Sequence, residues 1–238
     1  LRAIYADMHG AAQAVSRIMA QPLVPCALEF IDGAAIDMVR QHSSAELPQG
    51  AGALLMIEID GPEAAMAESQ AAIERAARGD GLLDLRVARD EAEVRALWAT
   101  RKALSPALRN VAPKKINEDV VVPVSQIPAL IASLAELGER HGITIVNFGH
   151  AGNGNIHVNL LVDPDDSAQM ARADACLDAV FARVLELGGT LSGEHGVGLV
   201  KRDFVAREID PASLALMQQI RHLFDPHGIL NPGKTLPA

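Results

Sequence analysis

Two glycine-rich segments contain the residue types best suited to chemistry, and the first of them carries two histidines. Residues 147–163 read N-F-G-H-A-G-N-G-N-I-H-V-N-L-L-V-D, and His150 and His157 flank a turn with two glycines. Glycine permits the positive φ angles of a sharp turn, so the turn can bring both imidazoles toward one point. Alternation along the following strand places His157 and Asn159 together, on the face opposite Val158.

The second segment, residues 192–201, reads S-G-E-H-G-V-G-L-V-K and places Glu194 and His195 between two glycines. Two histidines and one carboxylate form a three-ligand set that can hold zinc and leave a position open for a hydroxyl or water. Manganese or iron would also accept these ligands. The sequence does not show whether the two segments meet. Either could instead be a nest of backbone N–H groups for an anion, although neither has phosphate-loop spacing.

Alternating strand and helix patterns must position these residues. We expect strands at 24–32, 53–60, 82–88, 118–123, 143–148 and 156–162, with 110–117 as a loop. We expect helices at 10–20, 63–78, 91–109, 126–140, 167–187 and 211–224. This order predicts an α+β fold, a ferredoxin-like antiparallel sheet covered by helices. The rhythm occurs twice, before and after about residue 110, which suggests a duplication and two subdomains in one unit, although no sequence repeat supports it.

Composition narrows the function classes. The 238 residues are 49% hydrophobic and 21% charged, which allows a sizeable core. A net charge of -9 argues against nucleic acid, because binding phosphates needs a cationic face. Cys26 and Cys176 stand far apart, so we expect no disulfide and a reducing, cytoplasmic location. No apolar run reaches the roughly 18 residues of a membrane-spanning helix.

Five motifs in a fixed order give a family resemblance. They are W-x-x-R-K at 98–102, K-I-N-E-D-V-V-V-P at 115–123, H-x-G-x-G-N-x-H at 150–157, S-G-E-H-G-x-G at 192–198 and I-L-N-P-G-K at 229–234. Together they resemble the C-terminal domain of FAD-linked oxidases, a family that includes D-lactate dehydrogenase, the glycolate oxidase flavin subunit and D-2-hydroxyglutarate dehydrogenase. One departure is Asn153, where many relatives have Asp, and it lies in the turn rather than on a ligand.

The resemblance assigns roles to individual residues. By position in the motifs, His150, His157 and Glu194 match the metal ligands, and His195 matches the catalytic base. The residues that match substrate-binding positions are Arg101, Ser105 and Lys115 for the carboxylate, and Asn159 for a polar contact. Asn231 lies in the segment that resembles the family's return to the flavin domain, so we expect it near the flavin.

The resemblance also implies a function for residues 1–238 as a whole. It implies the metal- and substrate-binding half of a flavin-dependent 2-hydroxy-acid dehydrogenase, with hydride transfer to FAD. FAD would be bound mainly by an N-terminal domain that this chain lacks, so we expect the chain alone to be inactive. A homodimer, and contact with the inner membrane through an electron acceptor, are further expectations. The residues themselves leave two alternatives open: a free-standing metal-dependent hydrolase and a non-enzymatic α+β ligand-binding module.

Overall fold

A computed structural model describes residues 1–42, 48–108 and 112–237, without the side chains of 39, 41, 42, 100 and 103–108. In chain order the strands are β1 (Arg2–Tyr5), β2 (Ala27–Asp32), β3 (Ala53–Glu58), β4 (Leu82–Arg86), β5 (Lys114–Val121), β6 (Thr144–His150) and β7 (Asn155–Val162). The helices are α1 (Met8–Met19), α2 (Gly33–His42), α3 (Glu63–Ala77), α4 (Glu91–Leu108), α5 (Ile127–His141), α6 (Ser167–Glu186), α7 (Val205–Glu208) and α8 (Pro211–Phe224).

The seven strands form one antiparallel sheet in the order β4-β1-β3-β2-β6-β7-β5. The order β4-β1-β3-β2, with α1 and α3 as crossovers, is that of a ferredoxin-like unit. Strands β5, β6 and β7 with α5 and α6 repeat its first three strands and both helices. Thr190, which bridges to Val121 beside β5, lies where the fourth strand would be. The predicted α+β fold is therefore confirmed, and its two halves meet where β2 pairs with β6.

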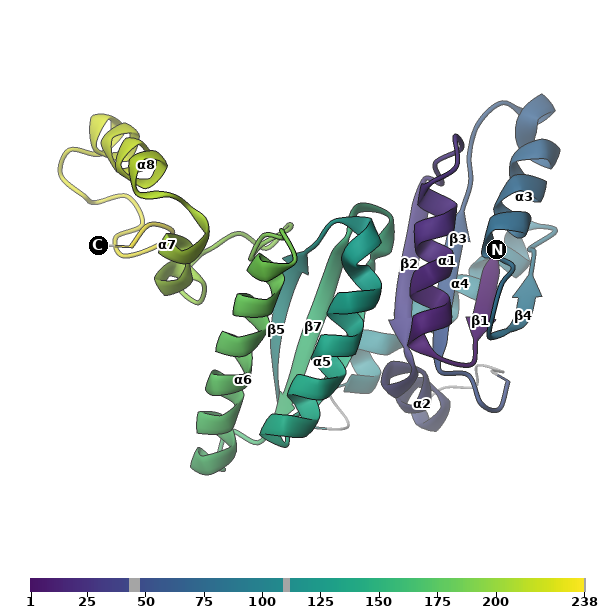
Figure 1. The fold of residues 1–238 in the computed structure, drawn as a ribbon, viewed down its shortest axis with the longest axis horizontal. Helices are drawn as coiled ribbons and strands as arrows, with labels where there is room; N and C mark the ends of the chain where they lie inside the picture. Colours follow the sequence, from purple (N-terminus) through teal and green to yellow (C-terminus); the bar gives the residue numbers. More distant parts are fainter. Residues whose placement is uncertain (43–47, 109–111, 238) are drawn as a thin grey trace.

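Helices cover the two faces of the sheet unequally. Figure 1 shows α1, α5 and α6 in front of the sheet, and the main core beneath this layer includes Phe30, Leu55 and Val158. A smaller core on the opposite face contains Ile31 and Phe148 and is covered by α2 and α4. Because α2 contacts β2, β3 and β6 and α4 packs against α2, the face beside them over β7 and β5 is left for polar side chains.

Three of these strands and helices were not predicted from the sequence, and one predicted loop is wrong. The short strand β1 and the helices α2 and α7 have no counterpart among the expected segments. The first turn of α2 is held by Asp32, whose Oδ1 accepts the N–H of Ala35 at 2.8 Å. Residues 114–117 were expected in a loop but form the first half of β5, because Lys115 pairs with Leu161 and Asn117 with Asn159.

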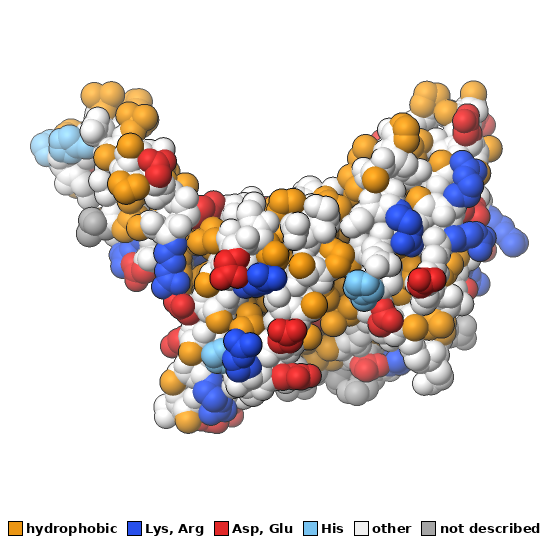
Figure 2. All heavy atoms as spheres, viewed as in Figure 1, with side chains coloured by type: hydrophobic (Ala, Val, Ile, Leu, Met, Phe, Trp, Pro, Cys, Tyr) orange, Lys and Arg blue, Asp and Glu red, His pale blue; other side chains and the backbone are white. Residues whose placement is uncertain are grey.

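The end of the chain forms an arm that projects beyond the β5 edge of the sheet (Figure 1). This C-terminal arm, residues 205–237, contains α7, α8 and a tail rich in proline and glycine. None of the residues of α8 is buried. Its exposed apolar side chains are Leu216, Met217, Ile220, Leu223 and Phe224, and Figure 2 shows apolar side chains gathered on the arm. The arm therefore presents an amphipathic helix whose apolar face is not covered by the rest of the described chain.

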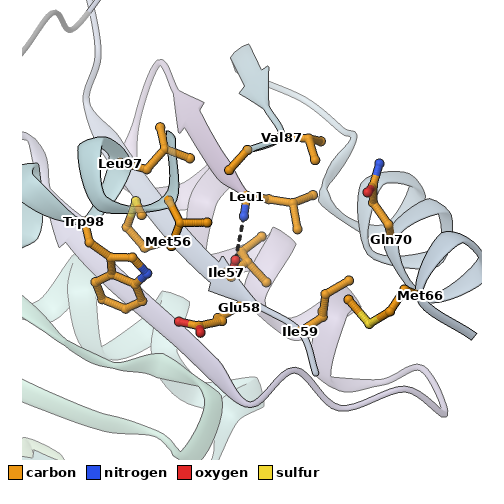
Figure 3. Close-up of a pocket in the computed structure, with 12 residues that line it drawn as sticks. Leu1, Met56, Ile57, Glu58, Ile59, Met66, Gln70, Val87, Leu97 and Trp98 are labelled. Carbon is orange, nitrogen blue, oxygen red and sulfur yellow. Dashed lines mark hydrogen bonds between the residues drawn. The ribbon is translucent and has the colours of Figure 1, made fainter. Parts of the chain in front are cut away.

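At the opposite end of the sheet, α3, β3 and α4 enclose a cavity of about 210 Å³ (Figure 3). Its walls are mostly apolar, with Met56, Met66 and Trp98 among them. The amino group of Leu1 donates a hydrogen bond to the Ile57 carbonyl at 2.7 Å. Among the described residues, no helix combines the length and apolarity needed to cross a bilayer.

Candidate metal and substrate site

His150, His157 and Glu194 meet at one point on the face of the sheet that carries α2 and α4. The Oε1 atom of Glu194 lies 3.7 Å from Nε2 of His150 and 3.3 Å from Nε2 of His157. One ligand atom from each of the three residues lies within 4.8 Å of the other two. The hairpin places both rings on the same face, since Phe148 pairs with His157 and His150 with Asn155. The sequence segments that carried the histidines and the carboxylate do meet.

The donor set fits a divalent cation. Two imidazole nitrogens and one carboxylate oxygen make three protein ligands and leave a coordination position open. Nδ1 of His157 is buried and has no hydrogen-bond partner in the described part of the chain. Burial lowers the pKa of His157, and the neighbouring His150 lowers it further against the opposing effect of Glu194. A neutral imidazole is the form that binds metal, so this shift favours coordination.

Glu29 on β2 connects His150 to Arg101. Its Oε1 accepts a hydrogen bond from Nδ1 of His150, and its Oε2 accepts one from Nε of Arg101 at 2.7 Å. The guanidinium group of Arg101 also lies over the Phe148 ring, 4.9 Å from its centroid. Arg101 is therefore held beside the histidines, on the side toward α4. We did not single out Glu29 from the sequence, although a carboxylate inside the apolar run A-L-E-F-I was a usable signal.

Asp119 on β5 holds the loop that carries Glu194 and His195. Its Oδ2 accepts the backbone N–H of Glu194 and that of His195, the latter at 2.8 Å. Its Oδ1 accepts from the ammonium group of Lys201 and lies 3.4 Å from Nδ1 of His195. Burial alone would raise the pKa of Asp119, but the hydrogen bonds from Lys201 and from the two N–H groups hold it well below its usual range. Asp119 is therefore a buried carboxylate anion.

The position of Asp119 had a signal in the sequence that was not used. Asp119 lies directly opposite His157 in the β5–β7 register, so the two side chains share a face. The motif K-I-N-E-D-V-V-V-P predicted a strand from residue 118, and alternation along that strand puts Asp119 on one face and Val120 on the other. What the sequence could not show was the pairing with β7, which turns this face toward the histidines.

His195 stacks against His157 at the open side of the cluster. The ring centroids lie 5.3 Å apart with an angle of 21° between the planes. The His195 side chain is 36% exposed, whereas that of His157 is 8% exposed. His195 can therefore reach a molecule bound in front of the cluster, while His157 forms part of its floor.

The remaining residues named from the resemblance lie in different surroundings. Asn159 is fully buried two positions beyond His157, and its Nδ2 donates to the carbonyls of Val146 at 3.0 Å and His157 at 3.1 Å. Its Oδ1 is buried and has no hydrogen-bond partner among the described atoms. Lys115 is half-buried on the same face of β5, opposite Leu161. The roles of Asn159 and Lys115 stay predictions.

Two further residues lie away from this group or outside the description. The side chain of Ser105, on α4, lies outside the described residues. Asn231 is in the C-terminal arm with a φ of 46°, and its carbonyl accepts from Nη2 of Arg221 at 3.1 Å. The proximity of Asn231 to a flavin also stays a prediction.

Comparison with protein families gives a match over almost the whole chain. The model described as FAD linked oxidases, C-terminal domain, matches residues 1–235. The chain belongs to this family. As an FAD-linked oxidase C-terminal domain, it places the histidines and glutamate of its two glycine-rich motifs at a single point.

Known relatives of this FAD-linked oxidase domain include three kinds of enzyme by name. Glycolate oxidase subunit GlcD of Bacillus subtilis is 34% identical over 234 residues, which cover 98% of this chain and 50% of the relative. A D-lactate dehydrogenase of Anaerostipes hadrus is 31% identical, with 97% of this chain and 50% of the relative covered. A D-2-hydroxyglutarate dehydrogenase of Xanthomonas citri pv. viticola is 35% identical, with 73% and 37% covered. The chain thus spans half or less of the length of these relatives.

Solved structures support the fold of the domain. A crystal structure of p-cresol methylhydroxylase with substrate bound superposes with a TM-score of 0.71 at 16% sequence identity. The superposition covers 98% of this chain and 52% of the other. At this identity the likeness concerns the fold alone.

Proposed function

We propose that this domain is the metal- and substrate-binding half of a flavin-dependent 2-hydroxy-acid dehydrogenase. The reaction is the oxidation of a hydroxy acid such as D-lactate, glycolate or D-2-hydroxyglutarate to the 2-oxo acid. The observation that carries the proposal is the meeting of His150, His157 and Glu194 beside Arg101 and His195. The names of the relatives, which include oxidases and dehydrogenases of all three acids, support the substrate class.

Arg101 binds the substrate carboxylate in this proposal. Its Nε is held by Glu29, and no other hydrogen bond of Arg101 is present among the described residues, so its two terminal nitrogens are available. A guanidinium group can donate two parallel hydrogen bonds to a carboxylate, a geometry that lysine does not reproduce. Ser105 and Lys115 add contacts to the same carboxylate, and Asn159 offers its unpaired Oδ1 to a polar group of the substrate.

His150, His157 and Glu194 would hold the cation, with zinc as the first candidate and manganese or iron as alternatives. A cation held there supplies Lewis acidity to the substrate hydroxyl, and FAD, bound mainly outside this chain, supplies the hydride acceptor.

His195 accepts the hydroxyl proton at Nε2. The Asp119 carboxylate, 3.4 Å from Nδ1, favours the tautomer with the proton on Nδ1, which leaves the Nε2 lone pair free to act as the base.

The C-terminal arm offers a surface on which a partner domain could pack. A row of exposed apolar side chains on α8, from Leu216 to Phe224, is typical of a surface that another domain covers. We propose that the FAD-binding domain packs there and brings the flavin near Asn231. A cytoplasmic location, a homodimer and contact with a membrane through the electron acceptor stay predictions.

The test uses the full-length protein that contains this chain. Anaerobic mixing with D-lactate, glycolate or D-2-hydroxyglutarate should bleach the flavin absorbance with one of them, and metal analysis should find a transition metal. In Glu194→Gln, we expect the metal to be lost and flavin reduction to slow by about 100-fold or more. Glu139→Gln, an exposed glutamate on α5, is the matched control.

Two outcomes would contradict the proposed function. One is flavin reduction at the wild-type rate by Glu194→Gln protein that contains no metal. The other is hydrolytic activity that depends on the metal and needs no flavin, which would favour the free-standing hydrolase.

A further inference from the structure

Glu29 uses each of its two carboxylate oxygens for a different functional side chain. Oε1 accepts from Nδ1 of His150, and Oε2 accepts from Nε of Arg101 at 2.7 Å. We infer that Glu29 is a positioning residue that sets the metal ligand and the carboxylate-binding arginine in one fixed relation. This inference rests on the proposed function, because it takes His150 as a ligand and Arg101 as the carboxylate binder.

The pairing of β2 with β6 explains how Glu29 can bridge His150 and Arg101 with its two carboxylate oxygens. Glu29 lies directly opposite His150 where β2 pairs with β6, so the two side chains leave the sheet side by side on one face. The Glu29 side chain is only 7% exposed, and both of its oxygens are occupied by donors from the same site. Among the described residues, these two hydrogen bonds are the only ones that Glu29 makes through its side chain. The hydrogen bonds to His150 and Arg101 therefore account for the presence of a buried carboxylate at this position.

The bridge decides which nitrogen of His150 can bind a cation. A carboxylate only accepts hydrogen bonds, so the bond to Glu29 requires the proton on Nδ1 of His150. The lone pair is then on Nε2, which is the atom 3.7 Å from Oε1 of Glu194. This is the arrangement in which a carboxylate behind a metal-bound histidine fixes its tautomer and ring orientation.

The same carboxylate decides how Arg101 faces the site. With Nε held by Glu29 and the guanidinium group lying over the Phe148 ring, the guanidinium plane is fixed from its edge and from its face. The terminal nitrogens make no hydrogen bond within the described part of the chain. Movement of Glu29 would therefore disturb both the cation ligand His150 and the orientation of Arg101.

The test measures two affinities in the full-length protein, with Zn²⁺ and oxalate as probes. In Glu29→Gln, the amide offers one acceptor and one donor group, so one of the two bonds is lost or His150 takes the wrong tautomer. We expect the Kd for Zn²⁺, measured by chelator competition, to rise about 10- to 100-fold. With Zn²⁺ saturating, we expect the Kd for oxalate to rise about tenfold.

A second variant separates position from charge and covers the case in which Glu29→Gln does not fold. Glu29→Asp keeps the negative charge but is one methylene shorter, so it cannot reach both donors. A positioning role predicts weaker Zn²⁺ and oxalate binding in Glu29→Asp as well, whereas a role of the charge alone predicts wild-type binding of both. Wild-type affinities for both probes in Glu29→Asp would overturn the inference.

Two controls separate this inference from the proposed function. Arg101→Met should lose oxalate binding and keep the Kd for Zn²⁺ within about threefold, because the bond between Glu29 and His150 remains. Glu194→Gln should lose Zn²⁺, and wild-type Zn²⁺ affinity in this variant would contradict the proposed function. If Glu194→Gln loses Zn²⁺ while both Glu29 variants bind both probes as the wild type does, only the positioning role is wrong.

Discussion

Lys201 is a buried cation shared by two carboxylates behind the candidate site. Its ammonium group donates to Asp119 and lies 3.4 Å from Oε2 of Glu118. Only 2% of Lys201 is exposed. Burial raises the pKa of Glu118 and the ammonium group opposes this effect. At the residue scale, the loop with Glu194 and His195 depends on Asp119, and Asp119 depends on this cation.

Replacing Lys201 by methionine should destabilise the fold strongly. Lys201→Met leaves two buried carboxylates without their shared cation, and breaking a buried ion pair from one side costs about 3–5 kcal/mol. Urea unfolding followed by circular dichroism measures the change. Lys102→Met, on an exposed position of α4, is the control and should change the free energy of unfolding by less than about 0.5 kcal/mol. If Lys201→Met lowers the free energy of unfolding by less than about 1 kcal/mol, the fold does not depend on this ion pair.

The β6–β7 hairpin is the element that brings the two histidines together. Its turn ends at Gly154, which has a φ of 81°, a conformation that L-residues rarely adopt. A Cβ atom added at Gly154 would lie 1.9 Å from the carbonyl oxygen of Val122. The glycine is therefore required by both its backbone conformation and the close approach of the next segment.

The substitution Gly154→Ala should lower the free energy of unfolding by more than the backbone strain alone would. We expect a loss of about 2–4 kcal/mol in the free energy of unfolding, since a steric clash adds to about 1 kcal/mol of strain. Gly188→Ala supplies the strain without the clash, because Gly188 has a φ of 73° and nothing within 4 Å of the added Cβ. Thermal unfolding of the two variants side by side measures the difference. Equal losses in both would mean that the structure relaxes around Gly154.

In the whole molecule, the two ferredoxin-like halves are joined through Asp32 as well as through the β2–β6 pairing. Oδ2 of Asp32 accepts the backbone N–H of Asn147 at 2.5 Å and its side-chain amide at 3.1 Å. Burial raises the pKa of Asp32 from 3.8 to about 6, although these hydrogen bonds and that from Ala35 lower it. In the folded state, the protonated carboxyl group is therefore favoured more than in the unfolded chain.

Because the pKa of Asp32 is raised in the folded state, the contribution of Asp32 to stability must change with pH in one direction. Between about pH 4 and 6 the folded state binds more protons than the unfolded state, so the contribution of Asp32 to stability falls as the pH rises, by about 3 kcal/mol in total. The difference in free energy of unfolding between wild type and Asp32→Asn should therefore be larger at pH 4 than at pH 7. Chemical denaturation across this range measures it, with Asp60→Asn at an exposed position as control. A difference that stays constant with pH would contradict the shift.

From the sequence alone, we could predict the α+β class, the family and the three residues that meet in the candidate metal site. Each of these depends on local patterns: glycine-flanked histidines, apolar alternation and motif order. The sequence also placed β6, β7, α3, α5, α6 and α8 close to their observed bounds, because these segments have strong apolar periodicity or clear ends. The short β1 and the helix α2 lack such signals, so they could not be predicted.

The side chains that support His150, Glu194 and His195 could be identified only in the folded structure. Glu29 and His150 are 121 residues apart, and Asp119 and His195 are 76 apart, so no local pattern relates them. Their meeting depends on two strand pairings, β2 with β6 and β5 with β7, and on register, since a shift of one residue would turn Glu29 or Asp119 to the opposite face. Strand pairing between distant segments is determined by the packing of the whole sheet, and this is why both supporting carboxylates were absent from the residues predicted to form the site.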